Sequence, residues 1–306
     1  MSGIPAPSEP VIRVRGLRKS YGDLEAVRGI DLEVAAGEIF AFLGPNGAGK
    51  TTTVEILEGY RPRDGGEVSV LGADPASPSR GWRERVGLVL QECRLTPELT
   101  VREAVDQYAG YYSHPRDPSE VIDLVGLSEK GEVRTGKLSG GQQRRLDVAL
   151  SLVGDPELLF LDEPTTGFDP SARRQAWEVI ASLRELGKTV FLTTHYMEEA
   201  QALADRVAIL VRGEVVLTGR PGELDGPGVA ETTISFRLPG GIPQEALPAR
   251  VRSLVAASPA GLSLRTGEAT QILQILTSWA LERGVELPGL EVRGPSLEDI
   301  YLEVTE

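Results

Sequence analysis

A glycine-rich stretch, GPNGAGKT at residues 44–51, carries the residue types and the spacing that bind phosphate. Glycines let successive backbone N–H groups turn toward one point without a Cβ in the way. Those groups and the N-terminus of the following helix together attract an anion. The positions match G-x-x-x-x-G-K-[ST], with an apolar run before them and a helical pattern after them. The members of this predicted phosphate-binding loop are Gly44, Pro45, Asn46, Gly47, Ala48, Gly49, Lys50 and Thr51.

The end of this loop supplies polar side chains for a nucleoside triphosphate and its metal ion. Lys50 can reach the β- and γ-phosphates, and the Thr51 hydroxyl is the expected Mg²⁺ ligand. Thr52 should contact the α-phosphate. A chance glycine-rich turn is the alternative, but the eight matched positions and both flanks argue against it.

A pair of carboxylates follows another apolar run, LLFL, at Asp162 and Glu163. Two acids at the end of a buried strand are costly unless a charged group meets them, and Mg²⁺ would do so. We assign Asp162 to the metal shell, through water, and Glu163 as the general base that polarises the attacking water. Without the upstream phosphate-binding loop, a solvated acidic loop would be the better interpretation.

The segments that position these residues alternate between strand and helix patterns. Continuously apolar runs, typical of strands buried on both faces, begin at Glu38, Glu157, Thr189 and Val207. A helical pattern covers residues 171–187, so the order predicts an α/β fold with a mostly parallel sheet. Earlier runs at residues 11–15 and 30–34 alternate between apolar and polar residues, which favours an attached antiparallel sheet. Residues 95–155 are mainly helical in pattern and predict an inserted helical subdomain.

The chain divides into three predicted regions. Residues 1–10, rich in Pro and Ser, are expected to be disordered. Residues 11–224 form the nucleotide-binding domain, and a cluster of glycine, proline and acidic residues breaks the pattern after residue 222. Residues 225–306 form a small α+β accessory domain, with a strand in ETTISFRL and two amphipathic helices. The first helix has Ile272, Ile275, Leu276 and Trp279 on one face, and the second, opened by Pro295 and Ser296, has Leu297, Ile300, Tyr301 and Val304.

Composition limits the classes of function. The chain has 306 residues, of which 41% are hydrophobic and 25% charged, as in globular proteins. No apolar run approaches the roughly 20 residues that cross a bilayer, and no signal-peptide pattern is present. A single cysteine, Cys93, allows no internal disulfide and fits a reducing cytosol. The net charge of −13 argues against a nucleic-acid partner.

The stretch LSGGQ, at residues 138–142, resembles the signature sequence of ATP-binding cassette (ABC) proteins. Physically, a serine and two glycines begin a helix, so the hydroxyl, backbone N–H groups and helix dipole can bind a γ-phosphate. Alone it would be equally consistent with an ordinary helix N-cap. The resemblance implies ATP as the nucleotide and the roles of ATP-binding residues for Ser139, Gly140, Gly141 and Gln142.

Four other positions match the ABC pattern residue by residue. Tyr21 resembles the aromatic residue that stacks on adenine, and Gln91 the glutamine that touches the metal ion or the attacking water. Asp169, in GFDP, lies in the D-loop pattern, and His195 resembles the switch histidine near the γ-phosphate. Taken singly, Tyr21 and His195 would be interpreted as structural, and Gln91 carries no signal. The D-loop departs from the commoner pattern in having a threonine and a phenylalanine at positions 166 and 168.

The resemblance also implies a quaternary state. The family places the signature of one subunit over the phosphate-binding loop of another, and this chain has one of each. It therefore carries two half-sites, and we expect a head-to-tail dimer that closes on two ATP molecules. The second subunit is another copy or a homologous ATPase.

The segments at residues 193–210 and 212–224, together with PSLEDIYLEVTE at the C-terminus, resemble the ABC-2 type, daunorubicin-resistance-like exporter branch. This resemblance implies an ATPase that converts ATP and water to ADP and phosphate. It would drive efflux of a drug, lipid or polysaccharide through separate integral membrane permease subunits. Such a chain would be peripheral, on the cytoplasmic face of the cell membrane.

Two other classes of function stay open at this point. One is a soluble ABC ATPase that acts on ribosomes or DNA, although the acidic charge and the missing second cassette or coiled-coil insertion argue against it. The other is a regulatory module whose C-terminal domain senses a ligand. That domain is either a packing appendage or a contact that controls dimer closure.

Overall fold

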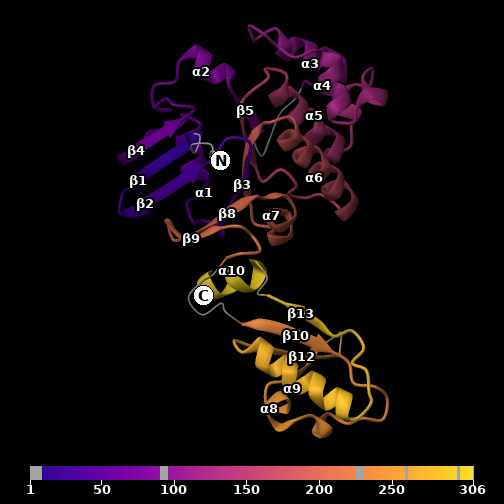
Figure 1. Ribbon diagram of the computed structural model, residues 1–306. Helices are drawn as coiled ribbons and strands as arrows, with labels where there is room; N and C mark the ends of the chain where they lie inside the picture. The colour runs from indigo at the N-terminus through magenta and orange to yellow at the C-terminus, as the bar shows by residue number, and fades with distance from the viewer. Residues whose placement is uncertain (1–8, 90–95, 225–230, 259–260, 295–296, 306) are drawn as a thin grey trace, which may run out of the picture. The chain divides into compact units, whose positions relative to one another are not determined.

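The computed structural model describes residues 9–89, 96–224, 231–258, 261–294 and 297–305 (Figure 1). The chain divides into two compact units, Met1–Pro221 and Gly222–Glu306. Most of the N-terminal segment expected to be disordered, Gln91 and Cys93 lie outside the described residues. Within those ranges, no helix combines the length and the apolar character needed to cross a bilayer.

A large sheet forms the centre of the first unit, and its described part has six strands in the order β5-β6-β7-β3-β8-β9. All neighbours pair in parallel except β8 and β9, which are antiparallel. The residues of β3 and β7 are buried throughout because both faces of this part of the sheet are covered. The strands span Ile39–Leu43 (β3), Val86–Val89 (β5), Leu158–Asp162 (β6), Thr189–Thr194 (β7), Arg206–Val211 (β8) and Glu214–Gly219 (β9).

Two layers cover the faces of the large sheet. On one side, three described strands form an antiparallel sheet in the order β2-β1-β4. On the other side lie the helices Val101–Ala109 (α3), Pro118–Leu124 (α4), Gly140–Leu152 (α5) and Pro170–Glu185 (α6). The two layers are therefore on opposite sides of the large sheet (Figure 1). The predicted fold class, with its antiparallel sheet and its helical insertion, is confirmed. The antiparallel strands are Ile12–Tyr21 (β1), Leu24–Val34 (β2) and Gly65–Val70 (β4), and the remaining helices of this unit include Arg80–Glu84 (α2) and Met197–Leu203 (α7).

Helix starts follow local capping chemistry. Val101–Ala109 (α3) and Gly140–Leu152 (α5) each begin at a capping box, in which the N-cap hydroxyl and the third residue satisfy each other's backbone N–H groups. Pro170–Glu185 (α6) begins with proline after an aspartate N-cap, and Pro118–Leu124 (α4) begins in the same way. These local signals agree with the predicted helical pattern at residues 171–187 and with the predicted helix start after Ser139.

The large sheet is packed on its antiparallel-sheet side by an aromatic cluster. The ring of Phe191 lies 5.7 Å from Phe40, 5.6 Å from Phe42 and 5.6 Å from Phe160, measured between centroids. All four rings are fully or almost fully buried. This core fixes the relative positions of β3, β6 and β7, whose carboxyl ends carry the candidate site.

The second unit is a small α+β structure. Its described strands form a sheet in the order β11-β12-β10-β13, with all pairs antiparallel. Helix α9 buries Ile272, Leu276 and Trp279 as its pattern predicts, while Ile275 is half-buried. Pro295 and Ser296 lie outside the described residues. The elements are Thr232–Phe236 (β10), Ala249–Arg252 (α8), Ala256–Ser258 (β11), Gly261–Thr266 (β12), Ala269–Glu282 (α9), Glu291–Arg293 (β13) and Leu297–Thr305 (α10).

Candidate nucleotide site

The phosphate-binding loop joins β3 to Lys50–Leu57 (α1) and is shaped by its glycines. Gly49 is the N-cap of α1 with φ 106°, a conformation that favours glycine. A Cβ on Gly44 would lie 2.4 Å from the carbonyl oxygen of Leu210, and one on Gly49 would lie 2.4 Å from that of Ala26. The sequence argument attributed these glycines to a close-lying phosphate. The structure adds a second reason, because the loop packs against the protein's own backbone.

Lys50, the charged residue of this loop, is buried, with only 7% of its surface exposed. Its Nζ donates hydrogen bonds to the carbonyl oxygens of Gly44 at 2.7 Å and Pro45 at 3.2 Å. Burial lowers the pKa of Lys50, while the nearby charges of Glu163 and Asp162 oppose this change. The ammonium group is therefore held across the loop in a partly desolvated place, where an anionic ligand would bind it strongly.

The carboxylate pair lies at the same edge of the sheet. Asp162 ends β6 and is the register partner of Thr193 in β7, whose hydroxyl donates a short hydrogen bond to its carboxylate. The same hydroxyl accepts a hydrogen bond of 3.0 Å from the backbone N–H of Glu163. Glu163 has φ 44°, a left-handed conformation that is unfavourable for a residue with a side chain.

Glu163 and His195 are brought together although they follow different strands. Nδ1 of His195 lies 3.2 Å from Oε1 of Glu163, close enough for an ion pair if the imidazole is protonated. Nδ1 has no hydrogen-bond partner in the described part of the chain, so this contact lacks hydrogen-bond geometry. Oε2 of Glu163 accepts a hydrogen bond of 3.1 Å from the hydroxyl of Thr166. The structure thus groups the predicted base and the predicted switch residue.

The imidazole also belongs to a ring stack. The ring of Tyr196 lies 4.1 Å from that of His195, and the guanidinium of Arg173 lies 4.1 Å from the Tyr196 centroid. Arg173 comes from the first turns of α6, just after the D-loop segment. Sequence reasoning missed this stack because residues 173 and 196 carry no motif that joins them.

Two buried side chains brace the loop after β6, and sequence reasoning missed both. Arg144, in α5, donates to the carbonyl oxygen of Asp162 at 2.8 Å and to that of Pro164 at 3.1 Å. Glu199, in α7, accepts hydrogen bonds from Thr165 at 2.7 Å and from the indole of Trp177 at 3.0 Å. A charged residue in an otherwise buried stretch of α5 is the one available sequence signal, since buried charges need partners.

The signature residues form the exposed tip of α5. Ser139 is the N-cap: its hydroxyl accepts from the backbone N–H of Gln142 at 3.4 Å, and Gln142 accepts from the backbone N–H of Ser139 at 3.0 Å. Gly140 is exposed, and a Cβ added there would meet no atom within 4 Å. Asp169 caps α6 through the N–H groups of residues 171 and 172. A hollow of about 300 Å³ lies between this tip and the start of α6.

Tyr21 lies at the end of β1, on the antiparallel sheet, and is 40% exposed. The cationic groups of Lys19 and Arg61 lie 5.7 Å and 5.3 Å from its ring centroid. An exposed aromatic face is compatible with stacking on a base. Gln91 lies outside the described residues.

Asp162 and the hydroxyl of Thr51 are the oxygen donors that suit a magnesium ion here. Among the described residues, no three His, Cys, Asp or Glu side chains are grouped as a metal site. Mg²⁺ bound with a nucleotide does not need such a group, because phosphates and waters fill most of its positions. The donor chemistry therefore fits a metal that arrives with the triphosphate.

Two family models match the chain. Residues 27–166 match the model described as ABC transporter, and residues 232–296 match a C-terminal domain described as ABC transporter domain-containing protein-like. The Nod factor export ATP-binding protein I of Rhizobium sp. (strain N33) is 40% identical, over 97% of this chain and 98% of the relative.

Solved structures of ATP-binding cassettes resemble the chain as well. The cbiO1 protein from Clostridium perfringens, part of the ABC transporter complex cbiONQ, has a TM-score of 0.65 at 29% identity and covers 71% of this chain and 90% of its own. The dimeric cassette MJ0796 in a post-hydrolysis state, bound to ADP and Pi, has a TM-score of 0.60 at 25% identity, with 68% and 98% coverage. The chain belongs to the ATP-binding proteins of ABC transporters, which are ATPases.

Proposed function

We propose that this chain is the ATP-hydrolysing subunit of an ABC exporter and that Glu163 is its general base. The observation that carries the proposal is the position of the Glu163 carboxylate, 3.2 Å from His195 and at the sheet edge that also ends in the phosphate-binding loop. In that place a carboxylate can accept the proton of a water that attacks the γ-phosphate. His195 would then lie near the γ-phosphate and interact with it.

We propose that the other predicted site residues hold Mg²⁺–ATP through separate contacts. We propose that the backbone of residues 44–49 and Lys50 bind the phosphates, that Thr52 contacts the α-phosphate and that Tyr21 stacks on adenine. Thr51 and Asp162 hold Mg²⁺, which supplies charge neutralisation on the β- and γ-oxygens when bound. Gln91 is proposed as a further contact to the metal or the water.

We further propose that catalysis needs a second subunit. The exposed tip at residues 139–142 of one chain, with Asp169, would close over the phosphate-binding loop of another copy or of a homologous ATPase. The free N–H groups at the start of α5 and the helix dipole suit a γ-phosphate. The dimeric cassette described above, bound to ADP and Pi, supports this arrangement at 25% identity.

Export is supported by the relative described above, which is named for Nod factor export and matches 97% of this chain. Its name favours an exporter over a ribosomal, DNA or regulatory ATPase. We propose that residues 11–224 form the ATPase domain, that residues 225–306 form an accessory domain, and that permease subunits lie in separate chains. The ATPase would then act on the cytoplasmic face of the membrane.

A groove in the first unit suits a segment of such a permease. It has a volume of about 550 Å³. Residues of α3 and α5 line one side, and residues of α2, of β5 and of the segment after α1 line the other. Aromatic side chains line it, with an acidic group at Glu58. Aromatic anchors of this kind are typical of protein interfaces. The aromatic residues are Tyr60, Trp82, Tyr108 and Tyr112.

Replacing Glu163 by Gln tests the proposed function. The amide keeps the size of the side chain but cannot accept the proton, so turnover should fall by about 10²–10⁴. Phosphate release measures turnover, and light scattering with Mg²⁺–ATP measures the dimer, which should accumulate because ATP stays intact. Normal turnover in this variant would remove Glu163 from its role. A variant that stays monomeric in Mg²⁺–ATP would contradict the two-half-site arrangement.

A further inference from the structure

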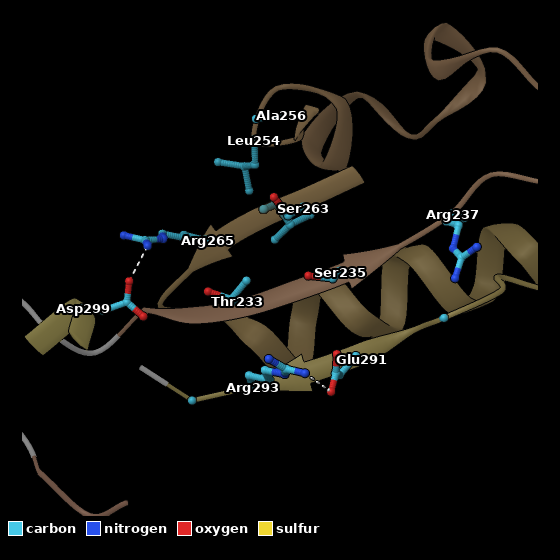
Figure 2. Close-up of a pocket in the computed structure, with 13 residues that line it drawn as sticks. Thr233, Ser235, Arg237, Leu254, Ala256, Ser263, Arg265, Glu291, Arg293 and Asp299 are labelled. Carbon is cyan, nitrogen blue, oxygen red and sulfur yellow. Dashed lines mark hydrogen bonds and ion pairs between the residues drawn. The ribbon is translucent and has the colours of Figure 1, made fainter. Parts of the chain in front are cut away.

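The outer face of the C-terminal sheet is polar and hollowed, and the proposed ATPase site does not use it. Ile234, Phe236 and Leu264 belong to the buried core of the unit. Helix α9 lies behind the sheet in Figure 2. Alternate residues of the same strands therefore point the other way, as period-two alternation requires. They line a hollow of about 780 Å³. Its polar residues include Thr233, Ser235, Arg237, Ser263, Arg265, Glu291, Arg293 and Asp299.

The strand register arranges these side chains in rows. Thr233 in β10 pairs with Arg265 in β12 on one side and with Arg293 in β13 on the other. Neighbouring strands lie about 4.8 Å apart, so the two arginines stand on backbones about 10 Å apart with a hydroxyl between them. Two residues further along β10, Ser235 pairs with Ser263, which continues the strip of hydroxyls.

The charge of this face differs from that of the rest of the chain. Residues 222–306 contain six basic and twelve acidic residues, in a protein with a net charge of −13. Three of the six basic residues, Arg237, Arg265 and Arg293, lie in this one hollow. Glu291 and Asp299 lie in the same hollow, so its three arginines leave a net charge of +1 there, whereas residues 222–306 as a whole carry −6. This local positive excess favours an anionic partner.

Each arginine is available to an external anion. Arg265 donates to the carboxylate of Asp299 at 2.5 Å, and Arg293 lies 2.8 Å from that of Glu291. Arg265, Arg293 and Glu291 are exposed and Asp299 is half-buried, so these ion pairs contribute little stability and exchange readily. The guanidinium of Arg237 is exposed and makes no hydrogen bond or ion pair within the described ranges. The Asp299 contact shows that an oxyanion fits Arg265.

The lining residues narrow the class of ligand. Guanidinium groups bind phosphate, sulfate or carboxylate through two parallel hydrogen bonds. Serine and threonine hydroxyls both donate and accept, which suits a ligand that itself carries hydroxyls. None of the described lining residues is aromatic, so the hollow offers no platform for a nucleobase and no anchor for an apolar helix. Its volume is that of a small-molecule site.

We propose that this face binds a small, hydroxyl-bearing molecule with at least two oxyanion groups, which Arg265 and Arg293 bind on either side of Thr233. Arg237 binds a further polar group along β10. A sugar bisphosphate has this chemistry, and a polycarboxylate shares its anionic part. The C-terminal unit would thereby act as a ligand sensor attached to an ATPase.

Calorimetry on the full chain tests the proposal, with the nucleotide site filled by ADP so that phosphate probes cannot bind there. The probes are fructose 1,6-bisphosphate, citrate, and fructose, which has the hydroxyls without the oxyanions. We expect one of the two anions to bind and fructose not to bind. If the chain binds one of the two anions more tightly, that preference identifies phosphate or carboxylate as the group that the site recognises. Absence of binding by both anions at millimolar concentration, or equal binding of fructose, would overturn the proposal.

Variants locate the binding. The double variant Arg265→Gln with Arg293→Gln should lower the affinity for the anion by about a hundredfold, since each charged contact contributes about tenfold to binding. Arg237→Gln should lower the affinity for the anion about tenfold or less, and it removes no ion pair or side-chain hydrogen bond seen among the described residues. Arg250→Gln, an exposed arginine paired with Glu268 outside the hollow, is the matched control. Unchanged affinity in both test variants would refute the site.

Discussion

The two halves of the nucleotide site differ in how far the chain itself completes them. The phosphate-binding loop is enclosed: Gly44 and Gly49 touch other backbone segments, and Lys50 is buried against two carbonyl oxygens. The signature tip is open. Ser139 and Gly140 are exposed, and space surrounds Gly140.

This difference separates two uses of glycine. In the loop, a side chain at position 44 or 49 would collide with the protein's own backbone, so glycine is needed for the fold. At the tip, the described structure gives no steric reason for glycine at position 140. The loop is therefore formed within one chain, whereas the tip, in the proposed dimer, would act only when another chain meets it.

The largest expected effect comes from the enclosed half. Lys50→Ala removes a desolvated cation and its hydrogen bonds to phosphate, so ATP affinity should fall by about 10–100-fold. Fluorescent nucleotide binding to the isolated chain measures this change. Because binding precedes closure, turnover and ATP-dependent dimerisation should both be lost at ATP concentrations that saturate the unmodified chain.

The matched control is Lys130→Ala, at an exposed lysine of a short 3₁₀ turn in the helical layer. It should leave ATP affinity unchanged. Equal affinities for Lys50→Ala and the unmodified chain would show that the enclosed ammonium does not bind phosphate.

Much of this difference was predictable from the sequence, because local patterns specify it. The apolar run, glycine loop and helix start identified the strand, loop and α1. The carboxylates at Asp162 and Glu163 were placed correctly at a strand end. The serine and glycines at residues 139–141 predicted the start of α5, and the helical pattern at residues 171–187 predicted α6.

Contacts between distant segments were not predictable. Arg144 and Glu199 support the loop after β6 through residues far away in sequence, and no local period encodes such pairings. The strain at Glu163 also depends on the surrounding sheet rather than on its own propensity. In the C-terminal unit, the sequence predicted a strand in ETTISFRL within an α+β domain but could not give the register that places Arg265 and Arg293 on either side of Thr233.

Gly140→Ala tests the open half. A methyl group there meets no atom within 4 Å, so the fold and the ATP affinity of the monomer should not change. In a closed dimer the methyl would stand between the helix N-terminus and the partner's γ-phosphate, and turnover should fall about tenfold through weakened hydrogen bonds. Steady-state phosphate release measures this change.

Gly81→Ala is the control, since that glycine also lies near the start of a helix and its added Cβ would meet no atom within 4 Å. Its turnover should be normal. If Gly140→Ala also turns over normally, the tip does not approach a triphosphate.

Mixing variants sharpens the comparison further. Lys50→Ala supplies an intact tip, and Gly140→Asp, whose carboxylate repels the triphosphate, supplies an intact loop. Each should be inactive alone, whereas a mixed dimer contains one composite site with both intact halves. Recovery of part of the turnover on mixing is expected, measured against each variant at the same total concentration. A mixture no more active than its components would mean that both halves act within one chain.

The smallest expected effect concerns stability and tests how desolvated the enclosed half is. Glu58 directly follows α1 and is 8% exposed; burial, with the charges of Asp162 and Glu55, raises its pKa to about 8. The unfolded chain releases this proton near pH 4.5, whereas the folded chain keeps it up to about pH 8. The contribution of Glu58 to stability is therefore complete below pH 4.5 and is lost as the pH rises toward 8.

Glu58→Gln keeps the neutral form at every pH and should remove this dependence, which amounts to about 1.4 kcal/mol per pH unit at most. Thermal unfolding without nucleotide, followed from pH 5 to pH 8, should show a Tm of the unmodified chain that falls more steeply than that of Glu58→Gln, by about 2–4 °C per pH unit. Glu178→Gln, at an exposed position of α6, should leave the slope unchanged. Parallel slopes for Glu58→Gln and the unmodified chain would mean that water reaches the end of α1. The enclosed phosphate-binding half would then differ less from the open signature tip than its burial indicates.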